Sequence, residues 1–298
     1  AIRPGTANLV FTPVPGYEEA VTGTLRASDS WSDLTGRAVV RYQINDVAQT
    51  FLSYSTGYKS GGFDSLEPST SDNPLDPEES TNYEWGIKGD FFNRRLITEL
   101  AVYYMELDGR QRSVYSKPPG QANATPILIN GDQEFTGVEI VLNWLITDTM
   151  NLGFLTTWRD EESTWEPFYD AQGELVVDAS SDTADTDYTF TFDWSPQISK
   201  GRLDLRAEYI FYENSILDDP TIIHPEGLKG YGEDRKLLNA RAAWSTDDGK
   251  WTFGIWGKNL LDNEVTSGVD NLTLASFGTP FVRIEPPRTY GIEVAYSF

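Results

Sequence analysis

The segment DYTFTFDW, residues 187–194, decides the fold class of this chain. Its even-numbered positions are all aromatic, and the positions between them carry only Asp and Thr. Successive side chains of an extended strand point to opposite faces, so this alternation gives one apolar and one polar face. The segment therefore predicts a strand that lies between an apolar environment and water.

The same alternation recurs along the whole chain, for instance at residues 81–92, 202–211 and 290–298. Most of the segments span about ten residues, which is longer than the average soluble strand and close to the length that a tilted membrane strand needs. We expect about eleven antiparallel strands, at roughly residues 37–46, 48–58, 81–92, 95–108, 134–146, 150–160, 185–195, 202–213, 236–246, 250–261 and 288–298.

The connections between these segments alternate between short and long. The long ones cover residues 59–80, 109–133, 161–184, 214–235 and 262–287. In an antiparallel meander every second connection lies at the same end, so all the long loops emerge together. This layout is typical of an outer-membrane β-barrel with short periplasmic turns and long extracellular loops.

The number of strands indicates a piece of a larger barrel. Eleven is odd, whereas single-chain bacterial barrels have even numbers of strands, and an open sheet edge in lipid is costly. We therefore expect residues 37–298 to form the C-terminal portion of a transmembrane β-barrel. Residues 1–36, interrupted by several prolines, are expected to form an extracellular loop with a possible short strand near residues 8–12.

The composition excludes several kinds of site. The chain has 46 acidic and 23 basic residues and a net charge of −23, which argues against a nucleic-acid partner. It has no Cys and a single histidine, His224, so thiolate and His-cluster metal sites are excluded. We expect no catalytic residues, no cofactor and no metal site.

Four segments carry a resemblance to a known family. They are YSTGYKSGGF at 54–63 with NYEWGIK at 82–88, GVE at 137–139, NLLDNE at 259–264, and PRTYG at 287–291 running on to Phe298. In order and spacing they resemble the barrel of the TonB-dependent outer-membrane receptors of the ferric-siderophore type. The likeness covers about residues 37–298, with Val265 standing where the family usually has Tyr.

The resemblance implies a location, a function and partners. It implies the outer membrane of a Gram-negative bacterium and the uptake of a scarce nutrient, above all a ferric siderophore. Transport would be driven by TonB through a plug domain and TonB box that are not within this sequence. The implied partners are outer-membrane lipid, a ferric chelate, TonB through that plug, and the barrel-assembly machinery. The end of the chain resembles the signal that this machinery reads, with alternate positions occupied by Tyr290, Ile292, Val294, Tyr296 and Phe298.

Aromatic and basic residues in or beside the long loops are the candidates for substrate binding. Aromatic rings and a few cations suit a flat, anionic ferric chelate. The candidates are Tyr58, Lys59, Trp165, Tyr169, Tyr231, Arg235, Phe281 and Arg283.

Three other functions remain open from the sequence alone. A passive porin-like barrel would need no plug, and free permeation of sugars would identify it. An outer-membrane barrel enzyme would need an acid–base group, for which His224 is the single histidine. A soluble β-sandwich binding module would be extracted without detergent.

Overall fold

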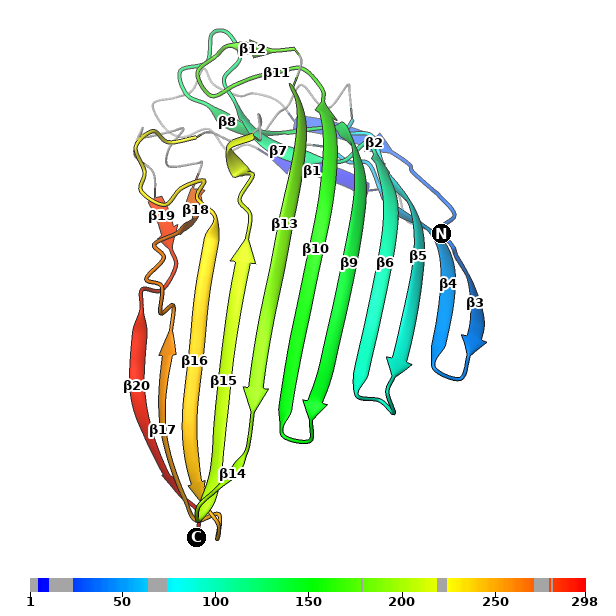
Figure 1. The fold of residues 1–298 in the computed structure, drawn as a ribbon. Helices are drawn as coiled ribbons and strands as arrows, with labels where there is room; N and C mark the ends of the chain where they lie inside the picture. Colours follow the sequence, from blue (N-terminus) through cyan, green and yellow to red (C-terminus); the bar gives the residue numbers. More distant parts are fainter. Residues whose placement is uncertain are drawn as a thin grey trace.

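The computed structural model describes residues 5–10, 24–63, 74–177, 179–218, 224–270, 279 and 281–298. These residues form an all-β structure built around one antiparallel sheet (Figure 1). One short 3-10 helix, η2 (Ile216–Asp218), is the only helical segment in the part of the chain that is described. None of the described helical residues forms a helix long and apolar enough to cross a membrane.

Eleven strands follow one another through the main sheet in chain order, and the short strand β14 (Gln197–Ile198) pairs beside β15. All of them pair antiparallel with their sequence neighbours. The prediction of eleven long strands is therefore confirmed. They are β3 (Arg37–Asn45), β4 (Ala48–Lys59), β5 (Glu78–Phe91), β6 (Leu96–Asp108), β9 (Gly131–Thr147), β10 (Met150–Trp165), β13 (Ala179–Trp194), β15 (Gly201–Tyr212), β16 (Arg235–Thr246), β17 (Trp251–Lys258) and β20 (Thr289–Tyr296).

Several strands extend further toward the long loops than the apolar pattern predicts. β10 ends at Trp165 instead of residue 160, and β13 begins at Ala179 instead of residue 185. The two strands stay paired over this added length, up to Trp165 opposite Ala179. Hydrogen bonding between strand backbones does not require an apolar face. Where both faces of the strands meet water or other loops, the alternation of apolar and polar residues ends before the strand pairing does.

The strand register sorts the side chains into two faces. Leu142, Phe154, Phe190, Tyr209 and Leu238 lie directly opposite one another across five neighbouring strands. One position further along, the row reads Asn143, Gly153, Thr191, Glu208 and Asn239. Directly opposed residues point to the same side of a sheet, so the sheet has an apolar face and a polar face.

Three of the long connections and the N-terminal segment before β3 carry four small two-stranded sheets, which gather at one end of the main sheet (Figure 1). They pair β1 (Gly5–Val10) with β2 (Thr24–Asp29), β7 (Arg112–Ser116) with β8 (Thr125–Ile129), β11 (Phe168–Tyr169) with β12 (Leu175–Val176), and β18 (Thr266–Asp270) with β19 (Phe281–Ile284). The predicted separation of short turns from long loops is confirmed. The strand pairings within residues 109–133, 161–184 and 262–287 were not predicted.

The main sheet is open within the described residues. β3 pairs only with β4, and β20 pairs only with β17. The strands curve around a common side, as Figure 1 shows, and the sheet has the form of a partial barrel.

Candidate functional site

The loop end of the polar face holds the first candidate site. Arg159 lies opposite Asp185, and Tyr212 lies opposite both Asp187 and Arg235, so polar and charged side chains of β10, β13, β15 and β16 meet there. Arg159, Asp185, Tyr212 and Arg235 line a cavity of about 410 Å³, which we call the mouth pocket. Its remaining lining comes from the loops that follow the strands: Glu213, Asn214, Ser215, Ile216, Val265, Thr266, Ser267 and Glu285.

Three ion pairs hold the arginines of the mouth pocket. Arg159 Nη2 lies 2.8 Å from Asp185 Oδ2 and 3.9 Å from Glu161 Oε2, and Arg235 Nη2 lies 3.3 Å from Glu285 Oε2. The Arg159 guanidinium also lies 5.9 Å from the ring centroid of Phe135. These ion pairs involve only Nη2 of each guanidinium. Nε and Nη1 of each arginine take no part in them.

Several polar atoms of the mouth pocket are buried without a hydrogen-bond partner among the described residues. They are Arg159 Nε, Asp185 Oδ1 and Arg235 Nε. A buried donor or acceptor without a partner costs about 1–3 kcal/mol. A molecule that enters the pocket and supplies both an acceptor and a donor would therefore be stabilised there.

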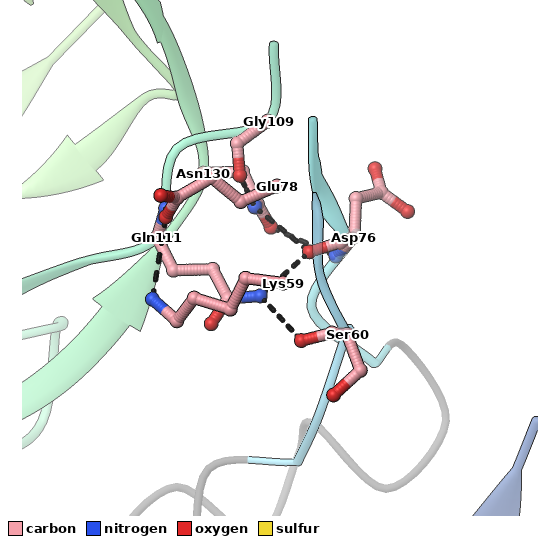
Figure 2. Close-up of polar contacts among 7 residues, drawn as sticks. All are labelled: Lys59, Ser60, Asp76, Glu78, Gly109, Gln111 and Asn130. Atoms are coloured by element: carbon pink, nitrogen blue, oxygen red, sulfur yellow. Dashed lines mark hydrogen bonds and ion pairs between the residues drawn. The ribbon is translucent and has the colours of Figure 1, made fainter. Parts of the chain in front are cut away.

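A second polar cluster joins two of the long connections at their base (Figure 2). The Asn130 side chain, 5% exposed, accepts a hydrogen bond from Asp76 N at 3.0 Å and donates one to Gly109 O at 2.6 Å. Gln111 donates from its side-chain amide to Ser60 O at 2.9 Å and to Asp76 O at 3.0 Å. These bonds tie Ser60 and Asp76 to the start and the end of the loop between β6 and β9.

A small hydrophobic core lies among the loops. Its buried members are Val114, Ile129, Trp165, Phe168 and Ala179, and we call it the loop core. It joins the β7–β8 hairpin to the ends of β10 and β13 and to β11. Such a core fixes the loops against the strands without any contribution from other parts of a barrel.

The predicted ligand residue Trp165 lies inside this core and not at the surface. Its side chain is 3% exposed, and the guanidinium groups of Arg110 and Arg112 lie 5.9 and 5.0 Å from its ring centroid. Tyr169, four residues further on, is half-buried in β11. Contact between Trp165 and a substrate stays a prediction that requires the covering arginines to move.

Tyr58 and Lys59 end β4 on opposite faces of the sheet. Lys59 Nζ lies 3.2 Å from Glu78 Oε2 on the neighbouring strand. Tyr58 is separated from Leu52 and Tyr54 by an even number of strand positions, so it points to the same, apolar face. Its hydroxyl is buried and has no hydrogen-bond partner among the described residues. The structure therefore separates these two neighbours in sequence.

The remaining predicted ligand residues lie on the C-terminal side of the mouth. Tyr231 is buried, and its hydroxyl lies 3.1 Å from Nδ1 of His224. Arg235 lines the mouth pocket. Phe281, which is 72% exposed, and Arg283 lie on β19. The eight predicted residues thus do not form one cluster.

The site residues that the sequence reasoning missed are Arg159, Glu285, Asn130 and Gln111. Arg159 could have been found from its place on the polar face of a strand beside a long loop. Asn130, Gln111 and Glu285 lie in irregular connections, where the alternation carries no information. Among the described residues, no group of three or more His, Asp or Glu is placed to hold a metal ion.

Electrostatic interactions outside the main sheet also connect the loops. Burial raises the pKa of Tyr115 on β7, and the nearby carboxylate of Asp270 on β18 raises it further. The hydrogen bond from Lys229 to Glu264 raises the pKa of that lysine. The β7–β8 hairpin therefore lies within electrostatic reach of the β18–β19 hairpin, across the loop end of the sheet.

The last strand presents its predicted signal residues on the apolar face. Tyr290, Ile292 and Val294 lie opposite Gly257, Ile255 and Phe253. All three are exposed, as are Tyr296 and Phe298. The outer edge of β20 has no neighbouring strand within the described residues.

Comparison with known proteins gives a consistent picture. Residues 14–260 match the family model described as TonB dependent receptor-like, beta-barrel. The chain is 28% identical over 137 residues to the probable TonB-dependent siderophore receptor PiuA of Acinetobacter baumannii, an alignment that covers 44% of this chain and 17% of that protein. It is 32% identical over 104 residues to the ferripyoverdine receptor of Pseudomonas aeruginosa, covering 33% of this chain and 12% of that protein.

Solved structures show the same fold. The ferric yersiniabactin uptake receptor FyuA from Yersinia pestis superposes with a TM-score of 0.65 at 15% identity, over 93% of this chain and 39% of that one. The receptor in the FpvAI–pyocin S2 complex gives a TM-score of 0.57 at 17% identity, over 93% of this chain and 33% of that one. The chain spans less than a fifth of either curated relative and about two fifths or less of these receptor structures.

Proposed function

The chain belongs to the TonB-dependent receptors, whose β-barrel model matches residues 14–260, and from this premise we propose that its protein takes up a ferric siderophore. It is an outer-membrane protein of a Gram-negative bacterium, as its family is. The observation that carries the substrate class is that the matched relatives are named as siderophore receptors. The chain itself supplies part of the barrel wall and several of its long loops.

The two faces of the sheet support this function. We propose that the apolar face meets outer-membrane lipid and that the polar face lines the lumen. The long loops then lie outside the cell, and the mouth pocket opens at the extracellular end of the lumen wall. A chelate bound at this end would pass inward when TonB acts on a plug domain, which is the route the family membership suggests.

The predicted ligand residues are not equally good candidates for contact with the chelate. Arg235 lines the mouth pocket, and Phe281 and Arg283 lie exposed nearby on β19, so these three are the leading candidates for contact. Lys59, Tyr169 and Tyr231 lie at the loop end in paired or half-buried positions. Tyr58 and Trp165 would act through packing unless the loops rearrange.

The family and the fold are those of transport receptors. We propose no catalytic role for the chain. His224, the single histidine, interacts with Tyr231 in a loop. For assembly we propose that the aromatic-ended strand β20 is recognised by the barrel-assembly machinery.

The proposal is tested by growth under iron limitation. Deleting the gene should abolish growth on the ferric siderophore that the receptor imports, and the intact gene supplied on a plasmid should restore it. Growth on inorganic iron in excess should not change. If the deletion strain grows normally on every ferric siderophore that the parent strain uses, the proposal is wrong. If liposomes containing the purified protein admit sugars freely, the porin alternative is correct.

A further inference from the structure

The NLLDNE segment at residues 259–264 is held by a single buried side chain. Asn259 is 5% exposed and has a positive φ of 49°, a backbone conformation that Asn tolerates better than most residues. Its Nδ2 donates to Asn263 O at 3.0 Å and to Pro286 O at 3.2 Å, and its Oδ1 accepts from Asn263 N at 2.9 Å. Asn259 therefore fastens both the start and the end of the connection between β17 and β20.

This connection supplies one side of the mouth pocket. Four of its residues line the pocket: Val265, Thr266, Ser267 and Glu285. They lie between the two points that Asn259 holds. Glu285 N also donates to Val265 O at 3.0 Å, so the two ends of the connection are bonded to each other. The placement of Asn259 thus sets the placement of this side of the pocket.

Asn259 is also bonded to the polar face of the sheet. Its backbone N–H donates to Oδ1 of Asn239 on β16 at 3.0 Å. Asn239 in turn donates from Nδ2 to Oε2 of Glu208 on β15 at 3.1 Å. Asn239 and Glu208 lie directly opposite one another in a row of the polar face, which we assign to the lumen. A carboxylate of the lumen wall is thus linked through one side chain to the residue that fastens the loop.

The polar contacts continue along the wall toward the short turns. Glu208 Oε1 lies 3.9 Å from Arg206 Nη2, and Arg206 Nη1 lies 3.2 Å from Asp193 Oδ1. Asp193 is next to the last residue of β13, at the short-turn end, whereas Asn259 follows β17 at the loop end. The contacts therefore cross the wall from one end to the other. We call this chain of residues the wall relay: Asp193, Arg206, Glu208, Asn239 and Asn259.

Asn239 is the member of the wall relay through which a change can pass. It uses its carbonyl oxygen for Asn259 and its amide nitrogen for Glu208, so its amide cannot turn over without losing both bonds. Linked hydrogen bonds of this kind strengthen one another. Removal of the Glu208 carboxylate leaves the Asn239 amide free to turn, and a turned amide no longer accepts the N–H of Asn259.

We infer that Glu208 and Asn239 are positioning residues for the mouth pocket, and that they couple contact at the lumen wall to the placement of the β17–β20 connection. This coupling goes beyond the proposed uptake of a ferric siderophore, because it does not depend on which molecule the barrel carries. A group in the lumen that pairs with Glu208 would withdraw it from Asn239 and loosen this side of the pocket. By thermodynamic linkage, a ligand that fixes the connection would strengthen the bond between Asn239 and Glu208.

The test follows the mobility of a spin label on this connection. The chain has no Cys, so Ile284→Cys on β19, where the native side chain is 66% exposed, provides one labelling site within it. The full receptor, with any cysteine elsewhere replaced by serine, is labelled and placed in lipid vesicles. Its electron paramagnetic resonance spectrum gives the ratio of mobile to immobile label. Glu208→Ala should raise this ratio at least about twofold, the low end of the coupling between residues in contact.

Two further variants separate the relay from a general loss of packing. Glu208→Gln keeps an oxygen that can accept from Asn239, so it should return the label close to its native mobility. Asn239→Leu should loosen the label as much as Glu208→Ala does. Adding Glu208→Ala to Asn239→Leu should have no further effect, because both changes interrupt the same path.

Glu99→Ala is the matched control. Glu99 also lies on the polar face in an ion pair, with Lys88, but it belongs to β6 and not to the wall relay. Its loss should leave the label at position 284 unchanged. A second label, introduced by Leu175→Cys on β12 where Leu175 is 52% exposed, should respond to none of the variants. If Asn239→Leu does not assemble, the comparison of Glu208→Ala with Glu208→Gln tests the inference by itself.

Three results would overturn the inference. They are an unchanged label at position 284 in Glu208→Ala, equal loosening by Glu208→Gln, and additive effects of Glu208→Ala and Asn239→Leu. The label reports on the loop without any substrate, so these results leave siderophore uptake untouched. Absence of growth on any ferric siderophore through this receptor would instead overturn the proposed function and leave the coupling in place.

Discussion

Asn130 shows how a single buried side chain organises the extracellular loops. Its amide bridges Asp76 and Gly109, which belong to different connections of the sheet. A side chain with two donors and an acceptor satisfies backbone groups on both sides at once. No apolar residue of similar size could replace these bonds.

We expect Asn130→Ala to loosen the loop base while leaving the strands intact. The substitution leaves the backbone groups of Asp76 and Gly109 without these partners, at a cost of about 1–3 kcal/mol. Amide hydrogen exchange should become faster around residues 74–78 and 109–111 and stay unchanged in β13 and β15. Asn123→Ala, at an exposed position of the β7–β8 connection, is the control. Equal exchange in both variants would show that the cluster does not hold the loops.

Gly131 offers a second test at the scale of one residue. A methyl group there would meet the Trp165 indole at 2.4 Å and the carbonyl oxygen of Thr164 at 2.6 Å. Overpacking of this kind typically costs about 1–3 kcal/mol. Gly131→Ala should therefore increase protease cleavage within residues 109–130. Gly36→Ala is the control, because a Cβ there would meet nothing within 4 Å, and it should be cleaved like the native protein. If the loop in Gly131→Ala stays as resistant to protease as in the native protein, the packing of the hairpin on Trp165 is contradicted.

At the scale of the element, the strands were predictable because the bilayer imposes a repeating constraint on each one. A segment such as residues 187–194 must put apolar side chains on one face at every second position. The strand ends were less predictable, since β10 and β13 stay paired beyond the last apolar position. The β7–β8 hairpin escaped prediction because its short strands carry mixed side chains held by the loop core.

A lysine on either face of the sheet distinguishes lipid from lumen. Ile255 lies in the middle of β17 and is 61% exposed on the apolar face. Ile255→Lys should lower the free energy of unfolding in bilayers by about 2–4 kcal/mol, as a charge near the membrane midplane does. Thr191→Lys, on the polar face opposite Glu208, should have a much smaller effect. Urea titration of the folded protein in lipid vesicles measures both, and equal effects would contradict the assignment of the two faces.

At the scale of the whole molecule, the family was predictable and the site was only partly so. Motifs such as residues 54–63 and 287–291 overlap the main-sheet strands β4 and β20. The mouth pocket instead depends on how separate loops meet, as Arg235 and Glu285 do across 50 positions of sequence. Trp165 was expected to face a ligand, yet it is buried. The sequence places an aromatic residue in a loop but does not show which other residues cover it.

The central claim is energy-dependent uptake of a ferric chelate, and one measurement tests it most directly. Cells that express the native receptor are given radioactive ferric siderophore, and surface-bound and accumulated iron are measured with and without functional TonB. Our account predicts that binding persists without TonB while accumulation falls to the level of cells that lack the receptor. Undiminished accumulation without TonB would contradict the account and point to a passive pore.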